Sequence, residues 1–113
     1  MEKITAGELY LKILEGEVIK WDEISQNYVC DDEFIEEFND KLDWYSLCKY
    51  QILTENIIDK YDYKIDWRIF SMYQKLTEDL IEKYKDKLSW YWVINENNFD
   101  KEFLLKYNKY IIK

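Results

Sequence analysis

Few side chains in this sequence could do chemistry, and their types and spacing argue against catalysis. There is no His, so a Ser–His or Cys–His nucleophilic pair cannot form. The glycines, Gly7 and Gly16, are too few for a phosphate-binding loop. Acidic pairs such as Asp31 and Asp32 occur, but at the start of an expected helix, where carboxylates cap the helix and meet water. We therefore expect a protein that is not an enzyme and that carries no cofactor or metal ion.

The two cysteines, Cys30 and Cys48, have no CxxC spacing and no neighbouring His. A zinc site needs about four N or S ligands, which this pair does not supply. The sequence alone permits a disulfide. However, Cys30 occupies a repeat position that is otherwise Leu or Phe, and Cys48 one that holds Ser in two repeats. We expect buried free thiols, which suit a reducing cytoplasm.

The elements that must position these residues follow from a recurring tryptophan. Trp21, Trp44, Trp67 and Trp90 follow one another every 23 residues, without insertion or deletion. A fixed period of this length is typical of repeat proteins. It predicts one domain, residues 1–113, with four repeats after an N-terminal cap. The cap is residues 1–20, and the repeats are residues 21–43, 44–66, 67–89 and 90–113.

Apolar spacing within each repeat predicts two short helices. Repeat positions 1, 4, 5 and 8, with the Trp as position 1, share one helix face, and positions 14, 15 and 18 share another. Candidate caps for the first helices are Asp43, Asp66 and Ser89, and for the second helices Asp31, Thr54, Thr77 and Asp100. Helices of about two turns are unstable alone. We expect an all-α fold, an N-terminal capping helix plus four stacked two-helix repeats in a short α-solenoid-like array of about nine helices.

Polar residues that recur in register have a structural interpretation. Ser25 and Ser71 share one repeat position, and Gln51 and Gln74 share another. We expect these side chains to bond backbone groups at the junction of helix and loop. The Trp column is expected to pack in the core, because a stacking platform for bases would also need a basic groove.

The two ends of the chain depart from the repeat. Thr5 and Glu8 form a capping-box pattern, and the helix that they begin is expected to end near Gly16. In the last repeat Leu105 takes a position that is acidic in the others, and Ile94 replaces Ser or Cys. This end is therefore less polar than the terminal repeat of an array usually is.

The formal charge of −8 bears on the partners that the protein could bind. Net acidity argues against direct binding to nucleic acid or to anionic lipid. No apolar stretch is long enough to cross a membrane, and no secretory signal is visible, so we expect a cytoplasmic protein. The net charge is confined to the first repeat, which holds nine acidic residues and one basic residue.

The acidic side chains of the first repeat have two interpretations. Glu33 and Glu37 lie at i and i+4, where like charges repel, whereas Asp79 and Lys83 at the same positions of the third repeat attract. The plainer interpretation is a solvated face, and the sharper one is a patch that binds a basic partner. The candidate patch consists of Asp22, Glu23, Asp31, Asp32, Glu33, Glu36, Glu37 and Asp40.

A second candidate surface lies at repeat positions 2 and 3. Its residues are Tyr45, Arg68, Tyr91 and Trp92, of types enriched at protein interfaces. Alternatively, the residues at position 3, such as Trp92 and Ile69, flank the core.

One repeat carries a motif that resembles a known class. The segment 67–81, with Trp67, Ser71, Gln74, Leu76 and Glu78, resembles a tandem repeat of the form W-x-x-I-S-x-x-Q-x-L-[ST]-E-x-F-I. Similar repeats occur in proteins of bacteriophages, large DNA viruses and low-GC bacteria. The resemblance covers residues 44–89 well and 21–113 loosely. It implies a stacked helical-repeat protein from a phage or mobile element. It does not imply an active site, because the shared residues are structural.

These observations lead to two functional hypotheses. The first is a non-enzymatic protein-binding module. In its concrete form, this module inhibits a host defence complex in the host-cell cytoplasm, and its acidic surface binds a basic partner. The second is a structural or assembly protein that forms a homo-oligomer through its aromatic surface or its apolar C-terminal end.

Overall fold

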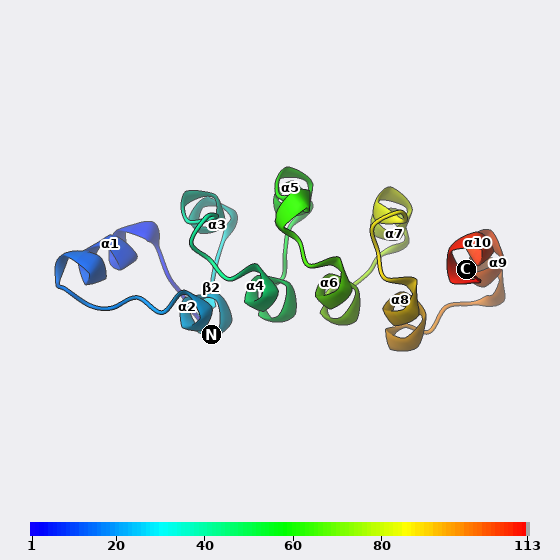
Figure 1. Cartoon of the computed structure of the whole chain (residues 1–113), viewed down its shortest axis with the longest axis horizontal. Helices are drawn as coiled ribbons and strands as arrows, with labels where there is room; N and C mark the ends of the chain where they lie inside the picture. Colours follow the sequence, from blue (N-terminus) through cyan, green and yellow to red (C-terminus); the bar gives the residue numbers. More distant parts are fainter. Residues whose placement is uncertain (113) are drawn as a thin grey trace. The chain divides into compact units, whose positions relative to one another are not determined.

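A computed structural model describes residues 1–112, and the chain divides into two compact units. The N-terminal unit is Met1–Ile65 and the C-terminal unit is Asp66–Lys113. The division falls one residue before the expected border between the second and third repeats. Within each unit, first helices form one layer and second helices another (Figure 1). The expected all-α class of helical repeats is confirmed.

In the N-terminal unit a capping helix precedes two helix pairs. The elements are β1 (Glu2–Lys3), α1 (Ala6–Leu14), α2 (Trp21–Asn27), β2 (Tyr28–Val29), α3 (Asp32–Glu37), α4 (Trp44–Tyr50), α5 (Glu55–Lys60) and the 3₁₀-helix η1 (Asp62–Lys64). Helix α2 packs beside α4, and α3 packs beside α5. Each pair therefore buries its apolar face against the next pair, as short helices of a repeat must.

The C-terminal unit repeats the same arrangement. Its elements are α6 (Trp67–Tyr73), α7 (Glu78–Tyr84), α8 (Trp90–Glu96), α9 (Lys101–Lys106) and α10 (Asn108–Ile111). Helix α6 packs beside α8, and α10 contacts both α8 and α9. The sequence led us to expect about nine helices. The described residues also form η1 and α10, which are single turns between or after the expected helices.

The regular spacing of the tryptophans places one helix start in each repeat. Helices α2, α4, α6 and α8 each begin at the Trp. In each repeat the Trp ring packs on the aromatic ring at position 18, with ring centroids 5.1–5.5 Å apart. The partners are Phe38, Tyr61, Tyr84 and Tyr107. The Trp column thus joins the two helices of each repeat, and its rings are buried or half-buried as expected.

The predicted caps of the second helices are confirmed. Asp31, Thr54, Thr77 and Asp100 each accept a hydrogen bond from the backbone N–H three residues later. Thr5 caps α1 in the same way, and α1 is followed by Gly16 at a φ of +84°, a conformation that favours glycine.

The predicted caps of the first helices are only partly right. Asp66 accepts a hydrogen bond from the Ile69 N–H at 3.1 Å. Asp43 and Ser89 make no side-chain cap, so this expectation was wrong for both. At Asp43 one carboxylate oxygen instead accepts the Ser46 hydroxyl at 2.6 Å. Nothing in the structure explains the missing cap at Ser89.

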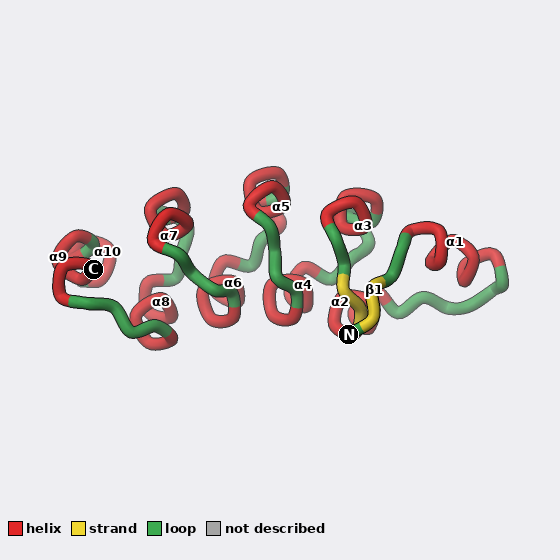
Figure 2. The backbone as a smooth tube through the Cα atoms, turned by 180° about the vertical axis from the view of Figure 1, so that it is seen from behind, coloured by secondary structure: helices red, strands yellow, loops and turns green. Residues whose placement is uncertain are grey.

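A short parallel pair of strands was not expected from the sequence. Strand β1 pairs with β2, so that Glu2 lies beside Tyr28 and Lys3 beside Val29 (Figure 2). The pairing leads into Ile4, which is buried and whose N–H donates to the Val29 carbonyl at 3.3 Å. Two-residue strands carry no alternating pattern, so local sequence could not reveal this contact.

The recurring polar side chains bond the backbone as expected. Ser25 and Ser71 each donate to the carbonyl of the Trp four residues earlier at 2.6 Å. Each hydroxyl also accepts the backbone N–H just before the next Trp at 3.0 Å. Each serine therefore ties the start of its own helix to the start of the next repeat.

In the part of the chain that the structure describes, no helix has the length and apolarity needed to cross a bilayer.

Candidate protein-binding surfaces

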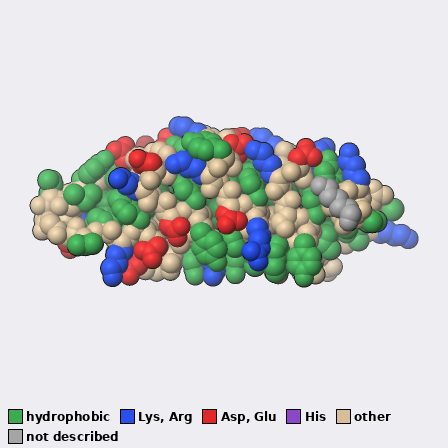
Figure 3. Space-filling model, in the orientation of Figure 1, with side chains coloured by type: hydrophobic (Ala, Val, Ile, Leu, Met, Phe, Trp, Pro, Cys, Tyr) green, Lys and Arg blue, Asp and Glu red, His purple; other side chains and the backbone are tan. Residues whose placement is uncertain are grey.

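The carboxylates of the first repeat gather around helix α3 and the N-terminal segment. A groove of about 500 Å³ is lined by residues from β1, the start of α1 and α3. Four carboxylates of the candidate patch contribute to it: Asp31, Glu33, Glu36 and Glu37. Figure 3 shows acidic side chains at the surface over α2 and α3. The structure thus brings half of the candidate patch to one concave place, which the sequence did not reveal.

Lys3 occupies part of this groove and shows how its carboxylates bind a cation. The Lys3 ammonium lies 2.8 Å from a carboxylate oxygen of Asp31. The same carboxylate accepts the Phe34 N–H at 2.9 Å. The hydrogen bond from Lys3, followed by that from Phe34, lowers the pKa of Asp31, and Asp31 in turn raises the pKa of Lys3.

Two further carboxylates of the patch bond residues outside the first repeat. Asp32 accepts the Thr54 hydroxyl at 2.8 and 2.9 Å, and Glu36 lies 3.4 Å from the Lys60 ammonium. These contacts join α3 to α5 across the surface. Asp32 and Glu36 are accordingly half-buried, so part of the acidity serves the packing of neighbouring repeats.

Glu37 has a different local partner. The Tyr10 hydroxyl of α1 donates to Glu37 at 2.5 Å, and this hydrogen bond is the main cause of a raised pKa at Tyr10. Glu33 faces the groove, is exposed, and adds to the electrostatic attraction on Lys3. Glu33 is therefore the groove carboxylate best placed to meet a partner.

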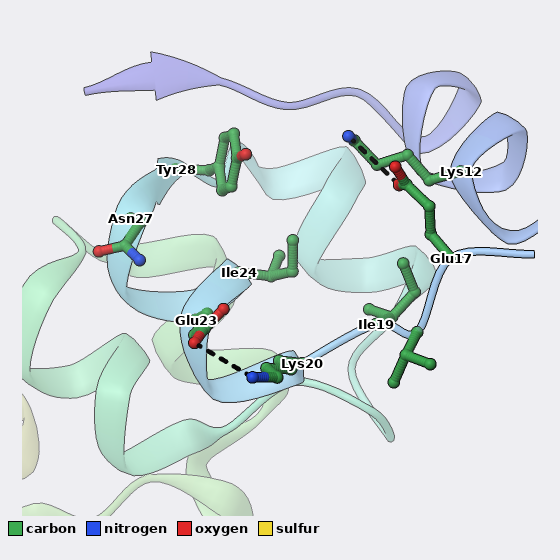
Figure 4. Close-up of a pocket in the computed structure, with 9 residues that line it drawn as sticks. Lys12, Glu17, Ile19, Lys20, Glu23, Ile24, Asn27 and Tyr28 are labelled. Atoms are coloured by element: carbon green, nitrogen blue, oxygen red, sulfur yellow. Dashed lines mark ion pairs between the residues drawn. The ribbon is translucent and has the colours of Figure 1, made fainter.

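The remaining candidates do not line this groove. Glu23 lies 3.9 Å from Lys20 beside a second hollow of about 470 Å³, between α2 and the chain that follows α1. Figure 4 shows this pair on one side of the hollow and the Lys12–Glu17 pair, at 3.4 Å, on the other. Asp22 on α2 and Asp40 after α3 are exposed and line neither hollow. The eight acidic residues thus form one groove and a scatter of single charges.

The aromatic candidates fall into two groups, one in each unit. Tyr45 of α4 is exposed in the N-terminal unit, and Arg68 and Tyr91 are exposed in the C-terminal unit. Trp92 is half-buried, with its ring edge-on to Tyr91 at 5.0 Å. Ile69, at the same repeat position as Trp92, is buried. Position 2 therefore faces outward in every repeat, whereas position 3 is exposed at Glu23 and partly or wholly buried in the later repeats.

Around Tyr45 the structure adds residues that sequence reasoning missed. Tyr50 is exposed, and the Lys49 ammonium lies 5.2 Å from the Tyr50 ring and 6.0 Å from the Tyr45 ring. Ile52 is 95% exposed. In Figure 3 hydrophobic side chains reach the surface over α4. These residues lie outside the recurring apolar columns, so the repeat pattern did not single them out.

The cysteines and the carboxylates offer little chemistry where the structure describes them. Both thiols are free and buried, as expected. Burial raises the pKa of the Cys30 thiol to about 11, so this thiol is protonated at neutral pH and unreactive. Among residues 1–112, no group of three or more His, Cys, Asp and Glu side chains is arranged to hold a metal ion.

Comparisons with known proteins complete this description. Protein-family models, curated protein sequences and solved structures give no match to the chain. The tandem repeat is therefore established by the chain itself, through Trp-started helices at a 23-residue spacing. The resemblance to repeats of phages, large DNA viruses and low-GC bacteria stays a prediction.

Proposed function

We propose that this chain is a non-enzymatic protein-binding module whose first repeat binds a basic surface of a partner protein. The observation that carries the proposal is the groove in which Asp31, Glu33, Glu36 and Glu37 converge. A concave acidic site of about 500 Å³ can receive a Lys or Arg side chain. The intramolecular Lys3–Asp31 pair is a precedent for such a contact.

The charge of the N-terminal unit supports a basic partner. Residues 1–65 hold sixteen acidic and seven basic side chains, a formal charge of −9, whereas residues 66–113 hold eight acidic and nine basic, a charge of +1. Such a field speeds association with a basic protein and repels nucleic acid and anionic membranes. The partner surface that fits best is one that itself binds nucleic acid.

The origin and the biological role belong to the same proposal. The motif in residues 67–81 resembles repeats of phage and related proteins. An acidic protein of this size from a phage or mobile element could inhibit a host defence complex in the cytoplasm by covering its nucleic-acid-binding surface. No catalytic step is needed for this role.

The test is capture of a partner from host lysate by matched variants. In E33K/E36K/E37K three groove carboxylates become cations. In the control D79K/D86K/E102K, three exposed carboxylates of the C-terminal unit are reversed, with the same change in net charge. We expect the first variant to lose about tenfold or more in affinity, because each reversed contact costs about 0.5 kcal/mol or more. The control is expected to bind almost as well as the wild type.

Two further measurements make this result specific. Glu36 and Glu37 bond other elements, so circular dichroism must show that the triple variant is folded. The single variant E33K changes an exposed carboxylate and is expected to weaken capture in part. Capture should fall as salt is raised. Equal loss of affinity in the groove variant and in the control would contradict the proposal.

A further inference from the structure

The last repeat exposes an apolar surface where the preceding repeats are polar or buried. A hollow of about 390 Å³ is lined by Ile94, Leu104, Leu105, Ile111 and Ile112, and we call it the C-terminal hollow. Leu105 is 62% exposed and Ile112 is 79% exposed. Exposed apolar side chains that gather in one hollow are candidates for an interface.

Comparison with the other repeats shows that the hollow departs from the pattern at several positions. Leu105 stands where the other repeats have Glu36, Asp59 and Glu82. Ile112 stands where they have Asp43, Asp66 and Ser89. Leu104 is exposed, whereas the residues in its column, Ile35, Ile58 and Ile81, are at most 1% exposed. The last repeat thus has an apolar outer face, in contrast to the polar outer face that shields the end of an array.

A second exposed apolar surface lies in the N-terminal unit, on helix α1. Leu9 is buried on the inner side of α1, while Leu11 and Leu14 are 59% and 81% exposed. Val18, just after the helix, is 87% exposed. We call Leu11 and Leu14 the α1 ridge. Helix α1 therefore carries one apolar side that packs inward and another that projects into solvent.

We propose that the α1 ridge of one copy docks into the C-terminal hollow of a second copy, so that the protein self-associates head to tail. Exposed leucine side chains of a helix can fill an apolar hollow, whereas two hollows placed face to face leave a void. The charges also fit, because the N-terminal unit at −9 meets the C-terminal unit at +1. Contact between two N-terminal units would instead bring together two surfaces that each carry a formal charge of −9.

This contact joins different surfaces of the two copies. A heterologous contact leaves a free ridge on one copy and a free hollow on the other, so a third copy can join. The proposal does not depend on the acidic groove or on its partner, because neither the ridge nor the hollow includes a groove carboxylate.

The test measures mass against concentration for the full chain and two variants. The ridge variant is L11S/L14S. The hollow variant is L105E/I112D, which introduces acidic residues where earlier repeats have acidic residues or, at Ser89, a serine. We expect the apparent mass of the wild type to rise at least twofold as concentration increases, and each variant alone to remain a monomer. An equimolar mixture of the two is expected to form a dimer and no larger species, because one intact ridge meets one intact hollow.

Controls keep each outcome informative. I52S replaces another highly exposed apolar side chain, outside both surfaces, and is expected to associate like the wild type. Circular dichroism checks the fold, and the single variants L14S and L105S replace the double ones if either loses its helical signal.

Three results would overturn the proposal. One is a wild type that stays monomeric up to a concentration of about 1 mM. Another is a ridge variant that associates alone as the wild type does, which would indicate contact between two hollows. The third is a failure of the two folded variants to pair in the mixture.

Discussion

Gln51 shows how much a single polar side chain can contribute in a domain of short helices. It follows α4 and is buried, and its amide nitrogen donates to the carbonyls of Ser25 at 2.9 Å and Tyr28 at 2.5 Å. Its amide oxygen accepts the Cys30 N–H at 3.0 Å. One side chain of the second repeat therefore satisfies three backbone groups of the first, at the point where α2 gives way to α3.

We predict that Gln51→Ala strongly destabilises the N-terminal unit. Two buried backbone groups and one part-buried group lose a hydrogen bond, and the expected fall in the free energy of unfolding is about 2–4 kcal/mol. Urea unfolding followed by circular dichroism measures it. The control is Gln26→Ala on α2, a half-buried position at which we expect a change within about 0.5 kcal/mol. A similar small change at Gln51 would contradict this account.

Two tyrosines of the C-terminal unit occupy the same repeat position but differ in their hydroxyl groups. The Tyr107 hydroxyl donates to a carboxylate oxygen of Glu82. The Tyr84 hydroxyl is buried and has no hydrogen-bond partner among the described residues. Burial, followed by the bond to Glu82, raises the pKa of Tyr107 to about 12, and the pKa of Glu82 is lowered chiefly by the same bond.

We predict opposite effects for the two Tyr→Phe changes. Tyr107→Phe destabilises the fold at neutral pH, because Glu82 loses a donor. Tyr84→Phe leaves the free energy of unfolding within about 0.5 kcal/mol of the wild type or raises it, because the hydroxyl removed has no partner. Urea unfolding at neutral pH compares the two. A larger loss of free energy of unfolding for Tyr84→Phe than for Tyr107→Phe would contradict the assigned hydrogen-bond partners.

The pH dependence of the Tyr107 contribution has a definite sign. A phenol whose pKa is raised on folding stabilises the fold below its unfolded pKa of about 10 and loses that contribution as the pH rises toward about 12. The difference in the free energy of unfolding between the wild type and Tyr107→Phe should therefore be smaller at about pH 11 than at about pH 8.

At the scale of elements, the helices differ in how their first turns are held. The second helices α3, α5, α7 and α9 all have a side-chain cap. Helices α2, α4 and α8 lack one. In all three the Trp ring packs on the aromatic ring of the second helix, and at α4 and α8 the residue before the Trp also donates its backbone N–H to the serine of the preceding repeat. Local capping and long-range contacts therefore do the same task in different helices.

We predict that this difference appears in a pair of variants within the C-terminal unit. Thr77→Ala removes the hydrogen bond from the Leu80 N–H, at 3.2 Å, and should cost about 1 kcal/mol. Ser89→Ala removes no cap and should change the free energy of unfolding by less than about 0.5 kcal/mol. Both residues immediately precede a helix, so the pair is matched in position. Equal costs in urea unfolding would contradict this reading.

At the scale of the whole molecule, charge and apolar surface are unevenly divided. The N-terminal unit carries a formal charge of −9 and the acidic groove, and the C-terminal unit is nearly neutral and holds the C-terminal hollow. Two of the eight acidic candidates, Asp32 and Glu36, bond residues of the second repeat and hold α3 to α5. These contacts give Asp32 and Glu36 a role in packing, and the binding-patch interpretation stays a prediction.

The sequence by itself determined the repeat, the pairs of helices, the buried columns and the caps of the second helices. These features depend on spacing within one repeat, because side chains three or four residues apart meet on a helix and a cap bonds a backbone group three residues away. The serine and glutamine bonds could be predicted for a similar reason, since residues such as Ser25 and Ser71 recur at the same place in successive repeats.

Only the tertiary structure decided which charged and aromatic residues face solvent. The pairing of β1 with β2, the bond from Tyr10 to Glu37 and the bond from Thr54 to Asp32 join segments more than 20 residues apart. Such contacts depend on how neighbouring elements pack, which the periodicity of one helix does not specify. The tertiary structure therefore located the acidic groove, separated exposed Tyr91 from half-buried Trp92, and left the last repeat with an apolar hollow.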